Sequence, residues 1–210
     1  QGVACGGVGC HIAHNVIAKN NWAGFSTGWE AGGGKMSRTT GLVVEHNVIH
    51  DNLGPGIWTD IDNLHATYRG NLVYNNAGDG IKHEISYDAH IVDNVCCLNG
   101  RDQDVWLWGS NVLVQNSRNV VVSGNTIVVG RYGNAIGLIQ QSRGSGHGPG
   151  YGPHLTYNNL VANNTVVYLA SWGKSAGGNA GGNGVGIPLD LETPFNSFKK
   201  HLLDKNDVDI

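Results

Sequence analysis

The sequence has few charges, few prolines and no long apolar run. Charged residues make up 14% of its 210 residues, and it contains 5 Pro, 4 Cys and 1 Met. No apolar stretch approaches the ~18 residues of a membrane span, and so few prolines exclude collagen. A formal net charge of −3 gives no electrostatic footprint for nucleic acid. We therefore expect neither a membrane span nor a nucleic-acid partner.

Glycine and asparagine are abundant instead. The chain holds 33 Gly and 24 Asn, and both are poor helix formers that are frequent in tight turns. Hydrophobic residues make up 40% of the chain, which is enough to form a core. This composition predicts short strands joined by many turns. The cysteines lack the CxxC spacing of a metal site, and their disulfide state is left open for Cys5, Cys10, Cys96 and Cys97.

A repeat of about 23 residues runs through the chain. Its anchor asparagines Asn47, Asn71 and Asn94 are 24 and 23 residues apart. The series extends at spacings of 32, 31 and 39 residues to Asn15, Asn125 and Asn164. A second series follows the anchors, at Asn20, Asn52, Asn75 and Asn99. Asparagine at fixed offsets indicates a solenoid whose longer rungs carry inserted loops.

Local patterning around each anchor predicts two short strands that meet at a bend. Apolar residues lie five and three positions before the anchor and two after it, as in Leu42, Val44 and Ile49, then Ala66, Tyr68 and Val73, then Val120, Val122 and Ile127. The residue just before the anchor is of a type that tolerates positive φ, namely His14, His46, Gly70, Asp93, Gly124 or Asn163. A third strand is expected to begin at Phe25, Ile57, Ile81, Val105 and Ile136. Three strands per rung predict an all-β, right-handed parallel β-helix of about six rungs.

The asparagine series and the rung length resemble the pectate-lyase-like superfamily of parallel β-helix proteins, in its bacterial extracellular type. The resemblance covers residues 8–170 and includes the segments Gly56–Asn63 and His83–Ala89. It implies an extracellular or periplasmic protein that acts on a polysaccharide or oligosaccharide. We expect the β-helix over residues 1–192 and an amphipathic capping helix with a tail over 193–210. No comparable helix precedes residue 8, which predicts an upstream domain or subunit that covers the first rung.

The outward face of the predicted third-strand sheet carries an unusual set of side chains. Neighbouring rungs lie ~4.8 Å apart, so we expect tryptophans and charged residues to be neighbours there, namely Trp58, Lys82 and Trp106, then Asp60, Glu84 and Trp108, then Glu30 and Asp62. Exposed aromatics beside carboxylates suit sugars. Insertions at Ala31–Thr40 and Ser142–Tyr157 are expected to follow the third strand and to wall this face, the second one carrying Arg143 and His147. His83 points inward and is predicted to be a hydrogen-bonded core histidine.

Three functions are compatible with this face. The first is a polysaccharide lyase that cleaves a uronate-containing glycan, with Lys82 as the base, Asp60 and Glu84 beside it, and Ca²⁺ held by Glu30, Asp60, Asp62 and Glu84. Substrate would be bound by Trp58, Trp106, Trp108, Arg143 and His147. The second is a glycoside hydrolase that uses Asp60 and Glu84 as its paired carboxylates. The third is a non-catalytic solenoid that binds glycans or has a structural role.

Overall fold

The described part of the chain is built from parallel strands. The computed structural model describes residues 1–103, 108–130, 134–143, 150–168, 183–186 and 206–208. Every strand pair within these ranges is parallel. The same residues contain no helix long and apolar enough to cross a membrane.

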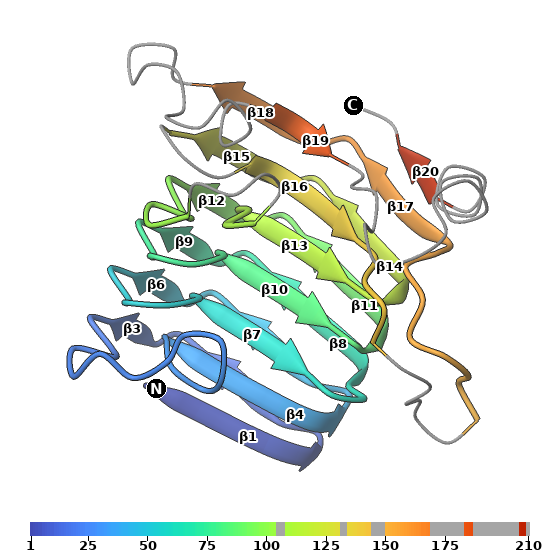
Figure 1. Ribbon diagram of the computed structural model, residues 1–210, viewed down its shortest axis with the longest axis horizontal. Coiled ribbons are helices and arrows are strands. Elements are labelled where there is room, and N and C mark those ends of the chain that lie inside the picture. The colour runs from blue at the N-terminus through green and yellow to red at the C-terminus, as the bar shows by residue number, and fades with distance from the viewer. Residues whose placement is uncertain (104–107, 131–133, 144–149, 169–182, 187–205, 209–210) are drawn as a thin grey trace.

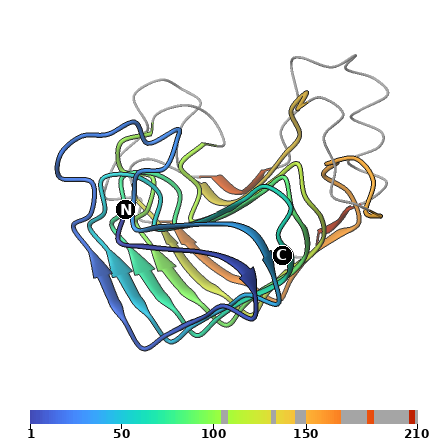
Figure 2. The same cartoon turned by 90° about the horizontal axis from the view of Figure 1, so that it is seen from below.

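The strands coil into a solenoid with three faces (Figure 1, Figure 2). The first-strand face consists of β2 (His11–Ala13), β5 (Val43–Glu45), β8 (Leu64–Arg69), β11 (Tyr87–Val92), β14 (Arg118–Ser123), β17 (Asn159–Ala162) and β20 (Asn206–Val208). The second-strand face consists of β3 (Val16–Ala18), β6 (Val48–His50), β9 (Leu72–Tyr74), β12 (Val95–Cys97), β15 (Thr126–Val129) and β18 (Thr165–Tyr168). The third-strand face consists of β1 (Val3–Val8), β4 (Gly34–Thr40), β7 (Ile57–Asp60), β10 (Ile81–Glu84), β13 (Val112–Gln115), β16 (Asn134–Ile139) and β19 (Asn183–Gly186).

The apolar positions flanking each anchor asparagine form the core, as the sequence predicts. All nine of the residues named for this pattern have no exposed surface, namely Leu42, Val44, Ile49, Ala66, Tyr68, Val73, Val120, Val122 and Ile127. Each stacks on its equivalent in the next rung, so the core is one continuous column along the solenoid axis. Burial of this column supplies the hydrophobic stabilisation that a single rung lacks.

The anchor asparagines form a hydrogen-bonded ladder inside the first bend. Each Nδ2 donates to Oδ1 of the next anchor at 2.9–3.1 Å, from Asn15 through Asn47, Asn71, Asn94 and Asn125 to Asn164. The six residues before the anchors all have positive φ, between 52° and 67°. The ladder thus satisfies buried amide groups at the bend of every rung.

The second asparagine series differs from the prediction at one position. The ladder runs from Asn20 through Asn52, Asn76 and Asn99 to Asn111, with Nδ2–Oδ1 distances of 2.8–2.9 Å. The predicted member Asn75 is wrong: its amide instead donates to Asp51 outside the ladder. Of the two adjacent asparagines, only Asn76 is fully buried.

The predicted third-strand residues lie in register in three rungs, and the strand lies elsewhere in two. Ile57, Ile81 and Ile136 lie in register as expected, but their partners in the other two rungs are Gly34 and Val112. Phe25 is therefore not an inward strand residue and is 73% exposed. The predicted start at Val105 lies outside the described residues. In both rungs the insertion precedes the third strand, and Ala31–Thr40 is largely the strand β4 rather than a wall.

His83 is a core histidine, as predicted. Its ring has no exposed surface, and Nδ1 lies 2.8 Å from Oγ1 of Thr59, which in turn lies 2.5 Å from the hydroxyl of Tyr68. Burial lowers the pKa of His83 to about 3, and a hydrogen bond with the backbone of Tyr87 opposes this shift. The ring is thus held neutral in the core of the solenoid.

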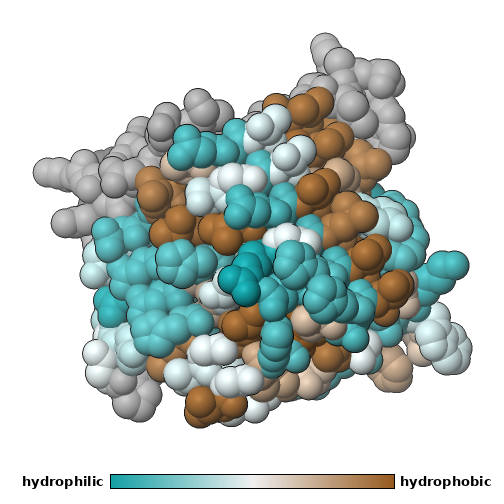
Figure 3. Space-filling view, turned by 180° about the vertical axis from the view of Figure 1, so that it is seen from behind, coloured by the Kyte–Doolittle hydropathy of each residue, from teal (hydrophilic) through white to brown (hydrophobic). Residues whose placement is uncertain are grey.

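The rear face and the two ends of the solenoid add no candidate site among the described residues. On the rear face, hydrophilic and hydrophobic residues are interspersed (Figure 3), so no single large apolar patch dominates that side. Most of the predicted capping helix over 193–210 lies outside the described residues, of which only β20 falls in this range. The strands β1, β2 and β3 end the solenoid at the first rung, and an upstream partner there stays a prediction.

Candidate functional site

The predicted cluster on the third-strand face forms around β7 and β10. Trp58 and Lys82 are paired across the two strands. Lys82 Nζ lies 2.9 Å from Oε2 of Glu84, and the indole Nε1 of Trp58 donates to the same oxygen at 2.9 Å. These three residues are at most 9% exposed. The predicted pairing of Trp58 with Lys82 is confirmed, but the neighbour of Lys82 on the other side is Leu113 rather than Trp106.

Each carboxylate of the cluster is paired with a cation. Lys35 on β4 reaches Asp60 at 2.8 Å, and Arg143 reaches the second oxygen of Glu84 at 2.9 Å. The ammonium groups of Lys35 and Lys82 also lie 3.8 and 4.4 Å from the centre of the Trp58 ring. Both oxygens of Glu84 are therefore engaged, which leaves no oxygen free to attack a sugar.

The other predicted site residues lie on the segments around this cluster. Asp62 follows β7, and its Oδ1 lies 2.8 Å from Nε2 of His154. Glu30 lies on the exposed loop before β4, and Trp108 packs against Leu113 and Ile139. Trp106 and His147 lie outside the described residues. The structure thus brings Asp60 and Glu84 near each other but does not place Glu30 on the same strand row.

The predicted calcium ligands do not converge. Within the described ranges, no group of three or more His, Cys, Asp or Glu residues is arranged to hold a metal ion. Asp60, Glu84 and Asp62 each face a Lys, Arg or His side chain instead. Cations at these positions compete with a divalent ion for the same oxygens. Calcium binding stays a prediction.

A groove of about 530 Å³ opens beside the cluster. It is lined by Asp79 and Lys82 and by two insertions, residues 21–28 and the described part of 102–109, which includes Trp108. Both insertions stand on the same side of the solenoid in Figure 2. Lys82 Nζ lies 5.7 Å from the centre of the Trp108 ring, so the groove combines an ammonium group with an aromatic wall.

Asp79 is a site residue that the sequence prediction missed. Burial raises its pKa to about 6, against the opposing effects of the Lys82 charge and of the Ser110 backbone N–H, which donates to Oδ1 at 2.8 Å. Such a pKa suits proton transfer near neutral pH. Asp79 thus adds an acid–base group to the ammonium group of Lys82.

A sequence signal for Asp79 does exist in its neighbours. It stands between Gly78 and Gly80, directly before the strand that begins at Ile81. Gly80 is required there because a Cβ atom would lie 2.4 Å from the carbonyl oxygen of Asn111 in the next rung.

Comparison with known proteins agrees with the solenoid. The sequence model of the right handed beta helix region matches residues 2–116. Among solved structures, the chain is similar to the A-module of the mannuronan C-5 epimerase AlgE4 of Azotobacter vinelandii, with 13% identity and a TM-score of 0.43. That similarity covers 78% of this chain and 48% of the module, so the chain spans about half of the module's length. No curated protein matches the sequence. With more than half of its residues matched by that sequence model, the chain belongs to the right-handed beta helix family.

Proposed function

We propose that the chain binds a uronate-containing polysaccharide in the groove beside β10 and cleaves it by β-elimination. The observation that carries the proposal is that Asp79 and Lys82 line one groove together with the aromatic ring of Trp108. The aromatic ring suits the apolar face of a sugar, and the ammonium group suits its carboxylate. An extracellular or periplasmic location belongs to the same proposal, because such polymers are met outside the cytoplasm.

The two charged groups take separate roles. Lys82, which the sequence suggested as the base, is paired with Glu84 at 2.9 Å and is assigned to neutralise the uronate carboxylate. Asp79 accepts the proton from C5, and the C4–O bond breaks as the C4–C5 double bond forms. The leaving oxygen then takes the proton back from Asp79. A carboxylate of raised pKa is the better proton acceptor for this step.

The hydrolase alternative is less well supported by the same contacts. It needs one carboxyl group that is free to act as nucleophile or base and a second that donates a proton. Both oxygens of Glu84 are held by Lys82, Trp58 and Arg143. A non-catalytic solenoid with a structural role remains the second candidate, because Trp58 is only 4% exposed and its indole is held by Glu84 rather than open to a ligand.

The test uses a panel of uronate polysaccharides, namely alginate, polygalacturonate and hyaluronan. Release of unsaturated product, followed by its ultraviolet absorbance, supports the lyase; reducing ends without that absorbance indicate a hydrolase. Polymer binding without either product indicates a binding module. Both of the latter results overturn the proposal.

Substitutions then test whether the groove is the active site. We expect Asp79→Asn to lower kcat by about 10²–10⁴-fold, the usual range for loss of a general base. Asp88→Asn, a carboxylate on the first-strand face that binds Asn119, is the matched control and keeps wild-type turnover. The wild-type kcat/KM should fall as the pH drops below about 6, because Asp79 with its raised pKa is then protonated. Full turnover in both Asp79→Asn and Lys82→Ala would show that the groove is not the site.

A further inference from the structure

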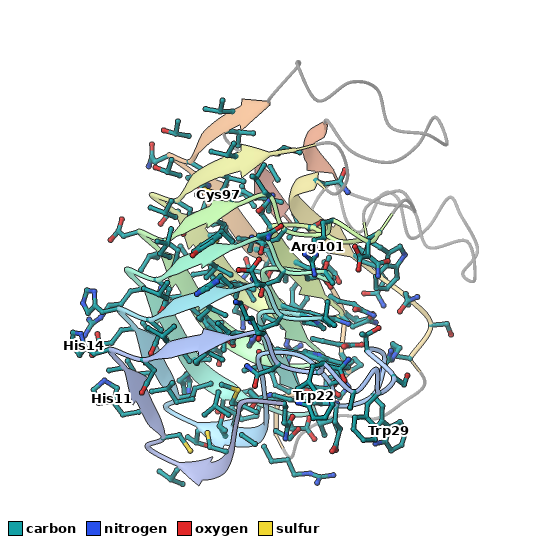
Figure 4. All side chains as sticks on the ribbon, turned by 90° about the vertical axis from the view of Figure 1, so that its left-hand side faces the viewer. His11, His14, Trp22, Trp29, Cys97 and Arg101 are labelled. Carbon is teal, nitrogen blue, oxygen red and sulfur yellow. The ribbon has the colours of Figure 1, made fainter. Side chains whose placement is uncertain are left out.

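The insertion before β4 leaves large aromatic side chains in solvent. Trp22 is 85% exposed, and Phe25 and Trp29 are each 73% exposed. Figure 4 shows Trp22 and Trp29 on the loop that stands out from the N-terminal rungs. Fully burying a side chain of this kind is worth roughly 1.5–3 kcal/mol, so folding gains little from them in this position.

The loop backbone that carries these rings is nevertheless fixed. The amide group of Asn21 donates to the carbonyl oxygens of Phe25 and Leu53 at 2.9 and 2.7 Å, and its oxygen accepts from the N–H of Phe25 at 2.8 Å. Asn21 itself is only 8% exposed. Gly24 closes the turn with a φ of +73°, a conformation that costs glycine little. The aromatic rings are therefore presented by a braced turn.

The same loop is tied to the charged cluster. Lys35 donates to the carbonyl oxygen of Trp29 at 2.7 Å while its ammonium group pairs with Asp60 at 2.8 Å. Trp29 is thus held at a fixed place relative to the third-strand face. Pre-organisation of this kind lowers the entropy cost of binding.

Two hollows meet at Phe25. This residue lines the groove that contains Asp79 and Lys82, and it also lines a second hollow of about 380 Å³. The second hollow is bordered further by Ser26, Trp29 and Glu30, which offer an aromatic face and polar groups side by side. Each hollow alone is within the roughly 300–1,000 Å³ of small-ligand sites. Together they offer space for several linked rings.

We infer that Phe25 and Trp29 form a second sugar-binding subsite for the same glycan chain that occupies the groove. The apolar C–H face of a sugar ring would pack on the indole, and its hydroxyls would bond to Ser26 and Glu30. The inference rests on the proposed function and deepens it: the substrate is a polymer that spans both hollows. A short fragment fills the groove alone.

The test compares Trp29→Ala with Trp22→Ala. Trp22 lies on the same loop and is at least as exposed, but it borders neither hollow, so it is the matched control. Affinity electrophoresis and kinetics use the polymer of the panel that the wild type binds, and its trisaccharide. We expect Trp29→Ala to lower the preference for polymer over trisaccharide by about two- to tenfold, in line with one aromatic contact. Trp22→Ala should leave this preference unchanged.

The outcomes separate the two proposals. An equal loss in Trp22→Ala and Trp29→Ala, or no loss in either, overturns the subsite even if the groove cleaves the polymer. If the wild type binds polymer without cleaving it and Trp29→Ala alone weakens binding, the subsite stands and the lyase proposal falls. Absence of polymer binding by the wild type across the panel overturns both.

Discussion

The buried ring of His83 makes the stability of the solenoid depend on pH. Its pKa falls from an ordinary 6.5 to about 3 because burial disfavours the charged imidazolium. The unfolded chain therefore binds a proton below pH 6.5 that the folded chain does not take up until about pH 3. Stability from this residue is fully present above pH 6.5 and is lost as the pH falls toward 3.

The size of the effect follows from the gap between the two pKa values. At about 1.4 kcal/mol per pH unit, acidification from pH 7 to pH 4 should cost about 3 kcal/mol through His83, and the full loss near pH 3 is about 5 kcal/mol. A loss of this size is a large part of the 5–15 kcal/mol that is typical of folded domains. Carboxylates also titrate in this range, so a comparison of variants has to isolate the histidine.

Urea titrations of the wild type and of His83→Gln at pH 7 and pH 4 measure the effect. Glutamine does not titrate, so the variant should lose about 3 kcal/mol less than the wild type between these pH values, whatever its own stability at pH 7. His90→Gln, on the exposed side of β11, should keep the wild-type dependence. If His83→Gln does not fold, the ring signals of His83 in wild-type NMR spectra should still report a neutral imidazole at pH 4. Equal losses in wild type and variant, or a ring that protonates near pH 6, would refute the reasoning.

Three further predictions concern the ladders, the bends and the metal. Asn71→Ala should cost about 1–3 kcal/mol of unfolding free energy, since the buried backbone N–H of Asn47 loses its acceptor; His90→Ala, at an exposed position of β11, is the control and should change stability by less than about 0.5 kcal/mol. Gly70→Ala should cost at least about 1–2 kcal/mol in the same urea titration, because φ is +60° and a Cβ atom would lie 2.7 Å from the His46 ring. If Ca²⁺ is bound as the sequence suggests, chelation should abolish turnover and added Ca²⁺ should restore it; turnover that is insensitive to chelator would remove calcium from the proposal.

The solenoid could be predicted because its signals are local and repeated. An anchor asparagine, a residue before it that tolerates positive φ, and apolar residues at fixed offsets recur in six rungs, from Asn15 to Asn164. Each rung needs the same bend and the same inward side chains. A rung whose own pattern is ambiguous can therefore be assigned from the pattern of its neighbours. The outward pair Trp58 and Lys82 followed from this register.

The positions of the third strand in the longer rungs could not be predicted in this way. The apolar residue Phe25 fits a strand start as well as Gly34 does, and nothing local shows whether an insertion precedes or follows the strand. The decision is made by pairing with the next rung, where Gly34 meets Ile57. A glycine is accommodated at this point because a Cβ atom would lie 2.5 Å from Val3 of the neighbouring rung.

The candidate site shows the same division. The sequence by itself determined the repeating rung, its inward and outward faces and the neighbours Trp58, Lys82 and Glu84, because these follow from strand alternation and a near-constant period. Only the tertiary structure decided that Asp79 is buried beside Lys82 and that Arg143, 59 positions along the chain, pairs with Glu84. Burial and pairing between charges depend on where inserted loops return to the solenoid, and that is set by packing in three dimensions rather than by any local pattern of residues.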